Sequence, residues 1–464
     1  MLNLRAKITS KLISMIFVQL AIVLICIFLG ARMSGIGLGV MGMIGLLLLI
    51  FIFRMQPSDP PLEVMLIIMS VVTAAAALQA AGGMDFLVNI AGKLLRSRPQ
   101  QITILGPLVT YFFTLFAGTA HISYSIMPII AEVAIKKRIR PERALSMSVT
   151  AAHMAITASP VSAATAALLT VLTASGVKLA DILMICIPST LIGVFVGILF
   201  VLKRGKELDV DPEFLERMKD PAFAKNLDLD ESQQLITLKP GATKSVAIFG
   251  LAVLAVVLLG SFPALLPEFS GKEGFTPGFA VNAAGQLQMP SMIMMVMLAA
   301  AGVIILFANT TAAQVTKASL FASAGQATIA VFGVVWMSST FMDHNYLVIE
   351  HALGDLVKSY PFTFAIALFT LSILLFSQAA TTKALMPLGL SLGMTPAYLM
   401  GIFPAVNGHF FVPGYPTLLT AIQFDRTGTT RIGKYVLNHS FMLPGLVTTI
   451  AAVVAGLIIQ SLLF

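Results

Sequence analysis

Two stretches of eleven residues, GTAHISYSIMP (118–128) and SQAATTKALMP (377–387), decide the fold. Each begins with small and polar residues, ends on Met-Pro, and lies inside a longer apolar segment, at 101–135 and 361–395. A membrane-spanning helix needs about 20 apolar residues, and the arm on either side of the polar run is shorter than that. Each segment therefore predicts a re-entrant hairpin, with two helical arms that meet at a tip.

Prolines beyond these stretches indicate an internal repeat. Three positions recur in both halves with offsets of 259, 255 and 256 residues: Pro128 and Pro387, Pro141 and Pro396, and Pro160 and Pro416. The nearly constant offset indicates two related halves, and a repeat fixes the architecture. The segments 144–176 and 397–424 are apolar but interrupted, so we expect one broken helix in each half.

The composition places most of the chain in lipid. Of its 464 residues 58% are hydrophobic and 11% charged, against about 25% charged in soluble domains. Continuous apolar runs favour helices over a barrel of alternating strands. The net charge of +8 lies in short loops and does not indicate a nucleic-acid partner. We expect spans at 16–31, 35–53, 64–82, 179–202, 245–263, 290–307, 324–342 and 440–462.

Charge predicts the orientation of the two hairpins. Basic residues flank 101–135 on both sides, which favours two cytoplasmic ends. The segment 361–395 follows an acidic stretch and precedes an uncharged one, so that hairpin should open outside. The prediction is an all-α polytopic protein of two inverted repeats, each with about five spans, one hairpin and one broken helix. Both termini then lie outside, although Arg5, Lys7 and Lys11 favour an inside N-terminus.

The same reasoning divides the chain into four parts. Residues 1–14 are an N-terminal extension, with Met15 as the functional start, and 15–202 form the first transmembrane repeat. Residues 203–244 are the one long polar stretch and form a cytoplasmic loop, and 245–464 form the second, inverted repeat.

Half-helix ends at mid-membrane would make a binding site. Their free N–H groups and positive dipole suit an anion, and nearby hydroxyl groups add ligands for a carboxylate. The alternative is that small polar residues only let helices pack closely. The candidate substrate-binding residues are Gly118, Thr119, His121, Ser123, Thr157, Ser159, Ser162, Ser377, Gln378, Thr381, Thr382, Lys383, Tyr415 and Thr417.

Lys383 is the most distinctive of these candidates. It is the one charged residue between Lys358 and Asp425, and an ionisable group inside a span indicates function unless it snorkels to the interface. We expect a bound dicarboxylate or backbone carbonyl groups to offset its charge. Glu132 suits an ordinary i,i+4 pair with Lys136.

The histidines near the breaks also enter the analysis. His121, His153 and His409 each lie in or beside a break, where we expect structural hydrogen bonds, with proton coupling as the alternative.

Several motifs resemble the anaerobic C4-dicarboxylate transporters (Dcu family, DcuA/DcuB-like) of bacteria. They are GTAH (118–121), TASP (157–160), SQAA (377–380), KALMP (383–387), YPT (415–417), IQFDRTGTTRIGK (422–434) and NHSF (438–441). The resemblance runs from about Val18 to the end of the chain, and the motif at 422–434 is the most specific. The sequence departs from the family pattern at 1–14 and in parts of 203–244 and 264–288.

The resemblance implies a secondary transporter of the ion-transporter superfamily in the bacterial inner membrane. It would take in fumarate, malate or aspartate and release succinate during anaerobic respiration by alternating access. Beside dicarboxylates and the bilayer, the resemblance admits a homodimer and a sensor kinase as partners, the kinase docking at 425–434.

Other function classes compete with this interpretation. A cation-coupled carrier of another organic anion, or an ion antiporter, would need a deep acid, and we find none beyond Glu132. A membrane enzyme would need paired ionisable residues at one depth; we find no catalytic constellation, metal motif or nucleotide loop, and expect no cofactor. A sensor without transport is the third alternative.

Labelling of single cysteines tests the hairpin topology. Cysteines at Arg98 and Arg140 should both react from the cytoplasm, and cysteines at Ser359 and Met394 should both react from outside. Maleimide labelling of cells and of inverted vesicles measures this. Members of one pair that label from opposite sides would contradict the re-entrant hairpin.

Overall fold

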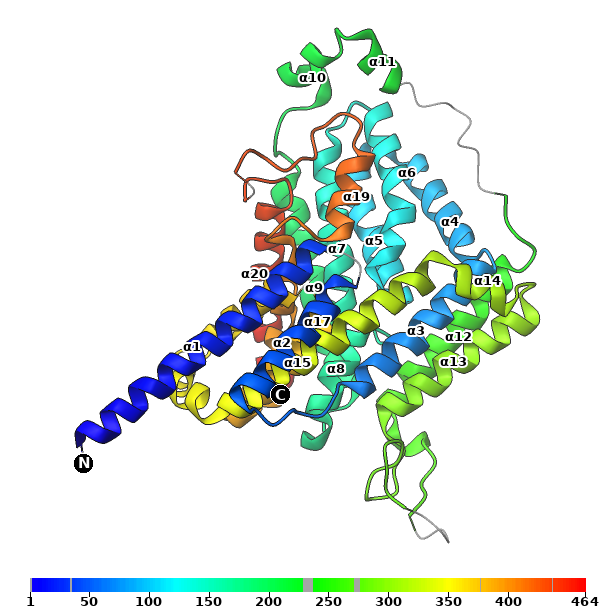
Figure 1. The fold of residues 1–464 in the computed structure, drawn as a ribbon. Coiled ribbons are helices and arrows are strands. Elements are labelled where there is room, and N and C mark those ends of the chain that lie inside the picture. The colour runs from blue at the N-terminus through cyan, green and yellow to red at the C-terminus, as the bar shows by residue number, and fades with distance from the viewer. Residues whose placement is uncertain (1, 34–35, 228–236, 271–275, 376, 436) are drawn as a thin grey trace.

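The computed structural model describes residues 2–33, 36–227, 237–270, 276–375, 377–435 and 437–464, and these residues are almost entirely helical (Figure 1). Eight helical segments among them are long and apolar enough to cross a membrane. Three further apolar helices, at 15–30, 37–53 and 362–373, are shorter. The expected all-α polytopic fold is thereby confirmed, while the count of five spans per repeat stays a prediction.

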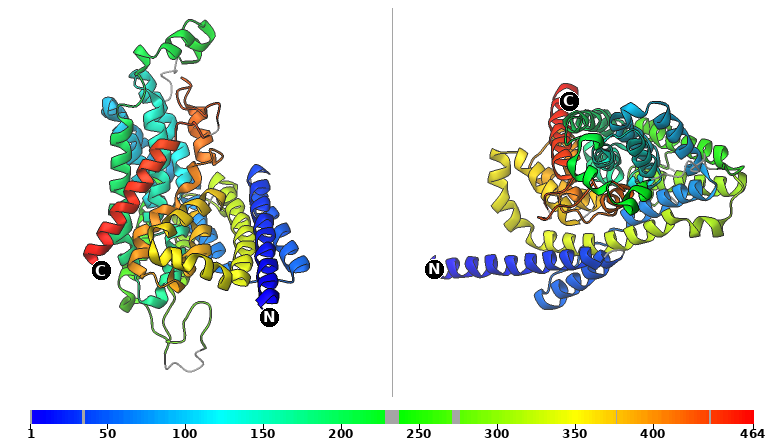
Figure 2. Two further views of the ribbon diagram at one scale, coloured as in Figure 1. Left: turned by 90° about the vertical axis from the view of Figure 1, so that its left-hand side faces the viewer. Right: turned by 90° about the horizontal axis from the view of Figure 1, so that it is seen from above.

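One group of helices forms a layer that we call the framework layer. It consists of α1 (Leu2–Met33), α2 (Gly37–Phe53), α3 (Leu62–Ala80), α12 (Ala242–Ser261), α13 (Met289–Phe307), α14 (Ala312–Lys317) and α15 (Ser319–Ser359). α15 packs against α2 and α3, and α13 packs against α3 and α12. Figure 2 shows α1 and α15 side by side at one edge of the molecule.

The second group, the site layer, holds both hairpins and both broken helices. It consists of α5 (Ile102–Ala117), α6 (Ser123–Lys136), α7 (Pro141–Ala158), α8 (Ala163–Leu172), α9 (Leu179–Val201), α16 (Phe362–Leu375), α17 (Gln378–Ser391), α18 (Pro396–Ile402), α19 (Pro416–Phe424) and α20 (Met442–Leu463). α9 pairs with α20, and α5 with α7. The layers meet where α3 contacts α8 and where α15 contacts α17.

Glycines let α2 and α15 approach closely. A Cβ added at Gly42 would lie 2.5 Å from the carbonyl carbon of Gly333, a distance that real Cβ atoms do not adopt. No hydrophobic effect drives helices together in lipid. Small residues at such a seam instead allow the close van der Waals packing that holds the two helices in contact. The indole of Trp336 closes the same seam by donating a 2.6 Å hydrogen bond to the carbonyl of Ser58.

Paired helices lie where both hairpins were expected, and their re-entrant course in the membrane stays a prediction. α5 ends at Ala117 and is capped by Gly118, whose φ of 70° is a left-handed conformation, and α6 returns beside α5. At the base, Arg96 donates a 2.9 Å hydrogen bond to Glu132, so the chain enters and leaves this hairpin at neighbouring points. In the second hairpin, a Cβ at Gly389 of α17 would meet the Phe364 ring of α16 at 2.9 Å, so those ends also lie together.

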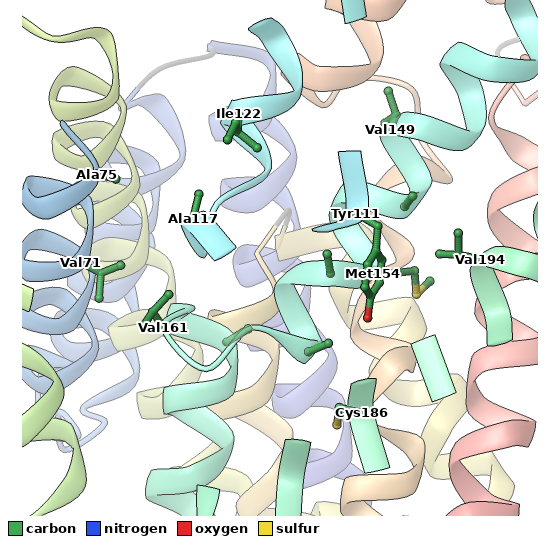
Figure 3. Close-up of a cluster of buried hydrophobic side chains, with 14 of the residues drawn as sticks. Val71, Ala75, Tyr111, Ala117, Ile122, Val149, Met154, Val161, Cys186 and Val194 are labelled. Atoms are coloured by element: carbon green, nitrogen blue, oxygen red, sulfur yellow. The ribbon is translucent and has the colours of Figure 1, made fainter. Parts of the chain in front are cut away.

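Each broken helix is interrupted inside the site layer. α7 ends at Ala158 and α8 begins at Ala163, with Ser162 as the N-cap of α8. α18 passes through two short 3-10 turns, at 403–406 and 408–410, before α19 begins. The first hairpin tip rests on the first break, since a Cβ at Gly118 would lie 2.9 Å from the carbonyl oxygen of Val161. Figure 3 shows Val161 below Ala117 and Ile122 at this tip.

The polar stretch after α9 folds back onto the site layer. It carries α10 (Pro212–Arg217) and α11 (Pro221–Leu227), seen above the helices in Figure 1. Arg431 donates hydrogen bonds of 2.7 and 2.9 Å to both carboxylate oxygens of Glu213. These hydrogen bonds hold the pKa of Glu213 below its usual value, so the carboxylate stays charged until the pH falls beneath that range.

Ion pairs connect this polar stretch to both halves of the chain. Arg140, at the start of α7, pairs with Asp211 at 2.5 Å, and Arg143 pairs with Glu207 at 2.5 Å. Together with the Arg431–Glu213 pair, they attach residues 207–213 to the base of the first broken helix and to the loop that follows the second.

Two boundaries and one additional helix differ from the sequence prediction. α1 begins at Leu2 rather than at residue 16, so residues 2–14 continue the first helix. α15 runs for 41 residues, because the charged stretch after 342 continues the helix instead of leaving it. α4 (Gly83–Ser97) was not expected, since it is an amphipathic helix that packs on α12 and α6 rather than an apolar span.

The glycine seam can be tested with a matched pair of substitutions. Gly42→Ala should lower the free energy of unfolding by roughly 1–3 kcal/mol, because a methyl group overpacks the contact with Gly333. Gly302→Ala on α13 has nothing within 4 Å and should be neutral or slightly stabilising. Thermal unfolding in detergent compares them, and equal behaviour of both variants would count against a tight seam.

Candidate functional site

The first hairpin tip is held together by its own side chains. Thr119 Oγ1 shares a 2.7 Å hydrogen bond with Nδ1 of His121 and accepts one from the His121 backbone N–H at 3.3 Å. Ser123 Oγ donates to the carbonyl of Ala120 at 2.6 Å. These polar groups satisfy the irregular backbone beside Gly118, which would otherwise carry unpaired groups inside the layer.

Hydroxyl groups also fill the first break. Ser159 Oγ donates to the carbonyl of Leu115 at 2.7 Å, which connects the break to the first hairpin. Ser162 Oγ donates to the carbonyl of Ile156 at 2.6 Å and accepts from the Thr165 N–H at 3.1 Å. Ser159 and Ser162 therefore pair with backbone groups in this conformation.

The second tip uses the same chemistry. Ser377 caps α17 by accepting a 3.2 Å hydrogen bond from the Ala380 N–H. Thr381 and Thr382 donate to carbonyl groups one turn earlier, at 2.8 and 2.7 Å. Gln378 differs, because its amide points to the second broken helix and donates to Oδ1 of Asn407 at 3.2 Å.

Side chains from both halves meet between the breaks, in a cluster that we call the polar centre. Its members are His153, Thr157, Gln378, Asn407, His409, Tyr415 and Thr417. Asn407 donates to Thr157 Oγ1 at 3.4 Å, and His153 Nε2 is hydrogen-bonded to Thr417 Oγ1 at 2.8 Å. Residues about 250 apart in the chain are thus brought into contact.

Two histidine rings lie against each other within the polar centre, tilted by 55°. The ring centroids of His153 and His409 lie 3.9 Å apart, and Tyr415 lies 4.9 Å from each. The histidines are only 3% and 1% exposed. Among the residues that the structure describes, neither ring nitrogen of His409 has a hydrogen-bond partner, and neither has Nδ1 of His153.

Such unpartnered groups are able to bind a ligand. A buried polar atom without a partner costs roughly 1–3 kcal/mol, so each one calls for an explanation, such as an ordered water or a bound solute. α17 begins at Gln378 and α19 begins one residue before Thr417, so the N-terminal ends of two helices start at the polar centre. Positive helix ends and unpaired ring nitrogens together can receive the oxygens of a carboxylate.

Lys383 lies apart from this network. Its ammonium group forms a 3.0 Å ion pair with Glu63, the second residue of α3, and the other Glu63 oxygen accepts a hydrogen bond from Thr170 at 3.3 Å. We expected a substrate or backbone carbonyl groups to offset this charge. A carboxylate of the framework layer does so instead.

The structure adds residues that sequence reasoning did not select. Asn407 and Glu63 were absent from the candidates, although the Asn407-Gly408-His409 run is polar within an apolar segment. His153 has the hydrogen bond that we expected, whereas the described residues give none to the ring of His409. The ordinary pair of Glu132 with Lys136 is confirmed at 3.1 Å.

The chain can now be compared with known proteins. A family model described as an anaerobic C4-dicarboxylate membrane transporter matches residues 15–464. The chain belongs to this family. It is 42% identical over 451 residues to the anaerobic C4-dicarboxylate transporter DcuB of Escherichia coli O6:H1, covering 96% of this chain and 98% of that one.

Two DcuA relatives agree with this assignment. The C4-dicarboxylate transporter DcuA of Wolinella succinogenes is 41% identical over 449 residues, with 97% of this chain and 100% of the relative covered. DcuA of Escherichia coli K12 is 39% identical over 448 residues, with 96% and 99% covered. The family and the eight apolar segments make the chain a multi-pass transporter of the bacterial inner membrane rather than an enzyme.

The unpartnered ring of His409 leads to a stability prediction. His409→Leu should raise the free energy of unfolding of the ligand-free protein by about 1 kcal/mol, because it removes buried, unsatisfied groups. His153→Leu should lower it by about 1 kcal/mol, because Thr417 loses its hydrogen-bond partner. Thermal unfolding in detergent measures both, and a loss of stability in both variants would contradict the unsatisfied state of His409.

Proposed function

We propose that the chain exchanges C4-dicarboxylates across the inner membrane by alternating access. Fumarate, malate and aspartate would enter and succinate would leave. The substrate would bind at the polar centre. The observation that carries the proposal is His409, which is buried where two helices begin and has no partner for either ring nitrogen within the described part of the chain.

The charge of the polar centre suits a dianion. Its seven members are neutral polar or titratable groups, and none is a carboxylate that would repel the substrate. Amide, imidazole and hydroxyl groups offer several donors, and the helix ends add partial positive charge. Two carboxylates about four carbons apart could each take one group of donors, whereas a monoanion would leave one group unpaired.

Alternating access follows from the proposed repeat. Each half, 15–202 and 245–464, carries a hairpin followed by a broken helix, and side chains of both halves meet at the polar centre. Inverted repeats of this kind carry substrates by moving one bundle against another around a site between them. We propose the same relation for these two halves, with the polar stretch 203–244 on the cytoplasmic side.

The remaining hydroxyl candidates would act as supports. In this conformation Thr119, Ser123, Ser159, Ser162 and Ser377 pair with nearby backbone or ring groups. We propose that they hold the half-helices in place, while the polar centre contacts the anion.

Counterflow in proteoliposomes tests the exchange. Vesicles loaded with succinate should accumulate labelled fumarate, and a simple monocarboxylate should compete poorly. His409→Leu should weaken fumarate binding by roughly 1.5–3 kcal/mol, the scale of a hydrogen bond to a charged group, or about ten- to hundred-fold in Kd.

A matched control is His344→Leu, an exposed histidine on α15, which should keep the wild-type Kd. Fumarate exchange that is unchanged in His409→Leu would remove the polar centre as the binding site. Equal competition by the monocarboxylate would contradict a site that holds two carboxylates.

A further inference from the structure

The Glu63–Lys383 ion pair joins the two layers of the molecule. Glu63 belongs to α3, which packs on α13 and α15 in the framework layer, while Lys383 belongs to α17, which packs on α8 and α16 in the site layer. Thr170 on α8 contacts the same carboxylate, so Glu63 is held by two elements of the site layer. The pair joins two residues that are 320 positions apart in the chain.

Each charge of the pair is compensated by the other. Lys383 is the one charged residue between Lys358 and Asp425, and Lys383 and Glu63 are only 20% and 23% exposed. Separating such a pair leaves each charge partly desolvated and uncompensated, which costs more than breaking a pair in water. The contact therefore favours the arrangement of layers in which it forms.

A transport cycle has to change this arrangement. If the site layer moves against the framework layer, contacts between the layers differ between the two end states. The polar centre is built within the site layer, whereas the Glu63–Lys383 pair crosses the boundary. A change at Glu63 should then alter the movement and leave the binding contacts in place.

We propose that Glu63 is a positioning residue for transport: its ion pair with Lys383 holds the second hairpin against the framework layer and opens in each half-cycle. This inference rests on the proposed exchange function. Lys383 then acts as the partner of Glu63, and the substrate carboxylates bind at the polar centre.

Charge reversal separates this role from that of a substrate ligand. Glu63→Lys and Lys383→Glu should each slow fumarate exchange at least about tenfold, because like charges disfavour the closed contact. The double variant should recover exchange to within about threefold of wild type. The fumarate Kd of Glu63→Lys should stay within about threefold of wild type, so that the effect lies in turnover.

Conservative and control variants complete the test. Glu63→Asp should exchange faster than Glu63→Lys, because it keeps the charge. The exposed pair Glu216–Lys219 provides the matched control, and its charge reversal should leave exchange unchanged. Should the double variant stay as slow as Lys383→Glu, the lysine binds substrate and the proposal fails. Single reversals without effect would also overturn it.

A readout without substrate keeps this proposal separate from the proposed function. In a background with Cys26 and Cys186 replaced by serine, a cysteine at Thr170 lies beside the pair. Glu63→Gln should raise its rate of maleimide labelling at least about fivefold, because the contact opens more often. An unchanged rate would refute the contact, whereas failure of wild-type counterflow would refute the exchange function alone.

Discussion

Lipid cannot hydrogen-bond to peptide groups, and the architecture follows from this constraint. Four interruptions expose backbone groups within the site layer, and each one is closed by a neighbouring hydroxyl group or carbonyl. Ser159 reaches across to Leu115, and Ser377 caps the helix that starts at the second tip. Because these groups have to be enclosed by protein, the breaks gather in the interior, where a polar solute could be bound.

The two layers meet this constraint in different ways. The framework layer has regular helices and achieves close contact through glycine, as between Gly42 and Gly333. The site layer has interrupted helices and adds polar pairs, such as His153 with Thr417, to close glycine contacts of its own, as between Gly401 and Gly456. A dry seam of backbone against backbone is rigid, whereas a polar network can exchange its internal hydrogen bonds for those of a ligand. This division suits a stationary support and a binding unit.

Local signals predicted the breaks, and long-range pairing escaped prediction. Gly118, Ser377 and the prolines mark interruptions because small residues, caps and missing N–H groups act within one turn. The partner of Lys383 lies 320 residues away, and no periodicity within α3 distinguishes Glu63 from an ordinary acid at a helix start. The unpartnered state of His409 likewise depends on which side chains surround it, which the order of residues along the chain does not reveal.

The seam between α2 and α15 has a consequence for biogenesis. Ser58, just after α2, donates its N–H to Thr340 of α15, and these residues are 282 positions apart. Synthesis from the N-terminus therefore completes α2 long before α15 begins. Until α15 is made, the glycine face of α2 lacks its partner, and the framework layer is completed only after the residues of the first hairpin and the first broken helix have been synthesised. The binding unit is thus partly synthesised before its support is complete.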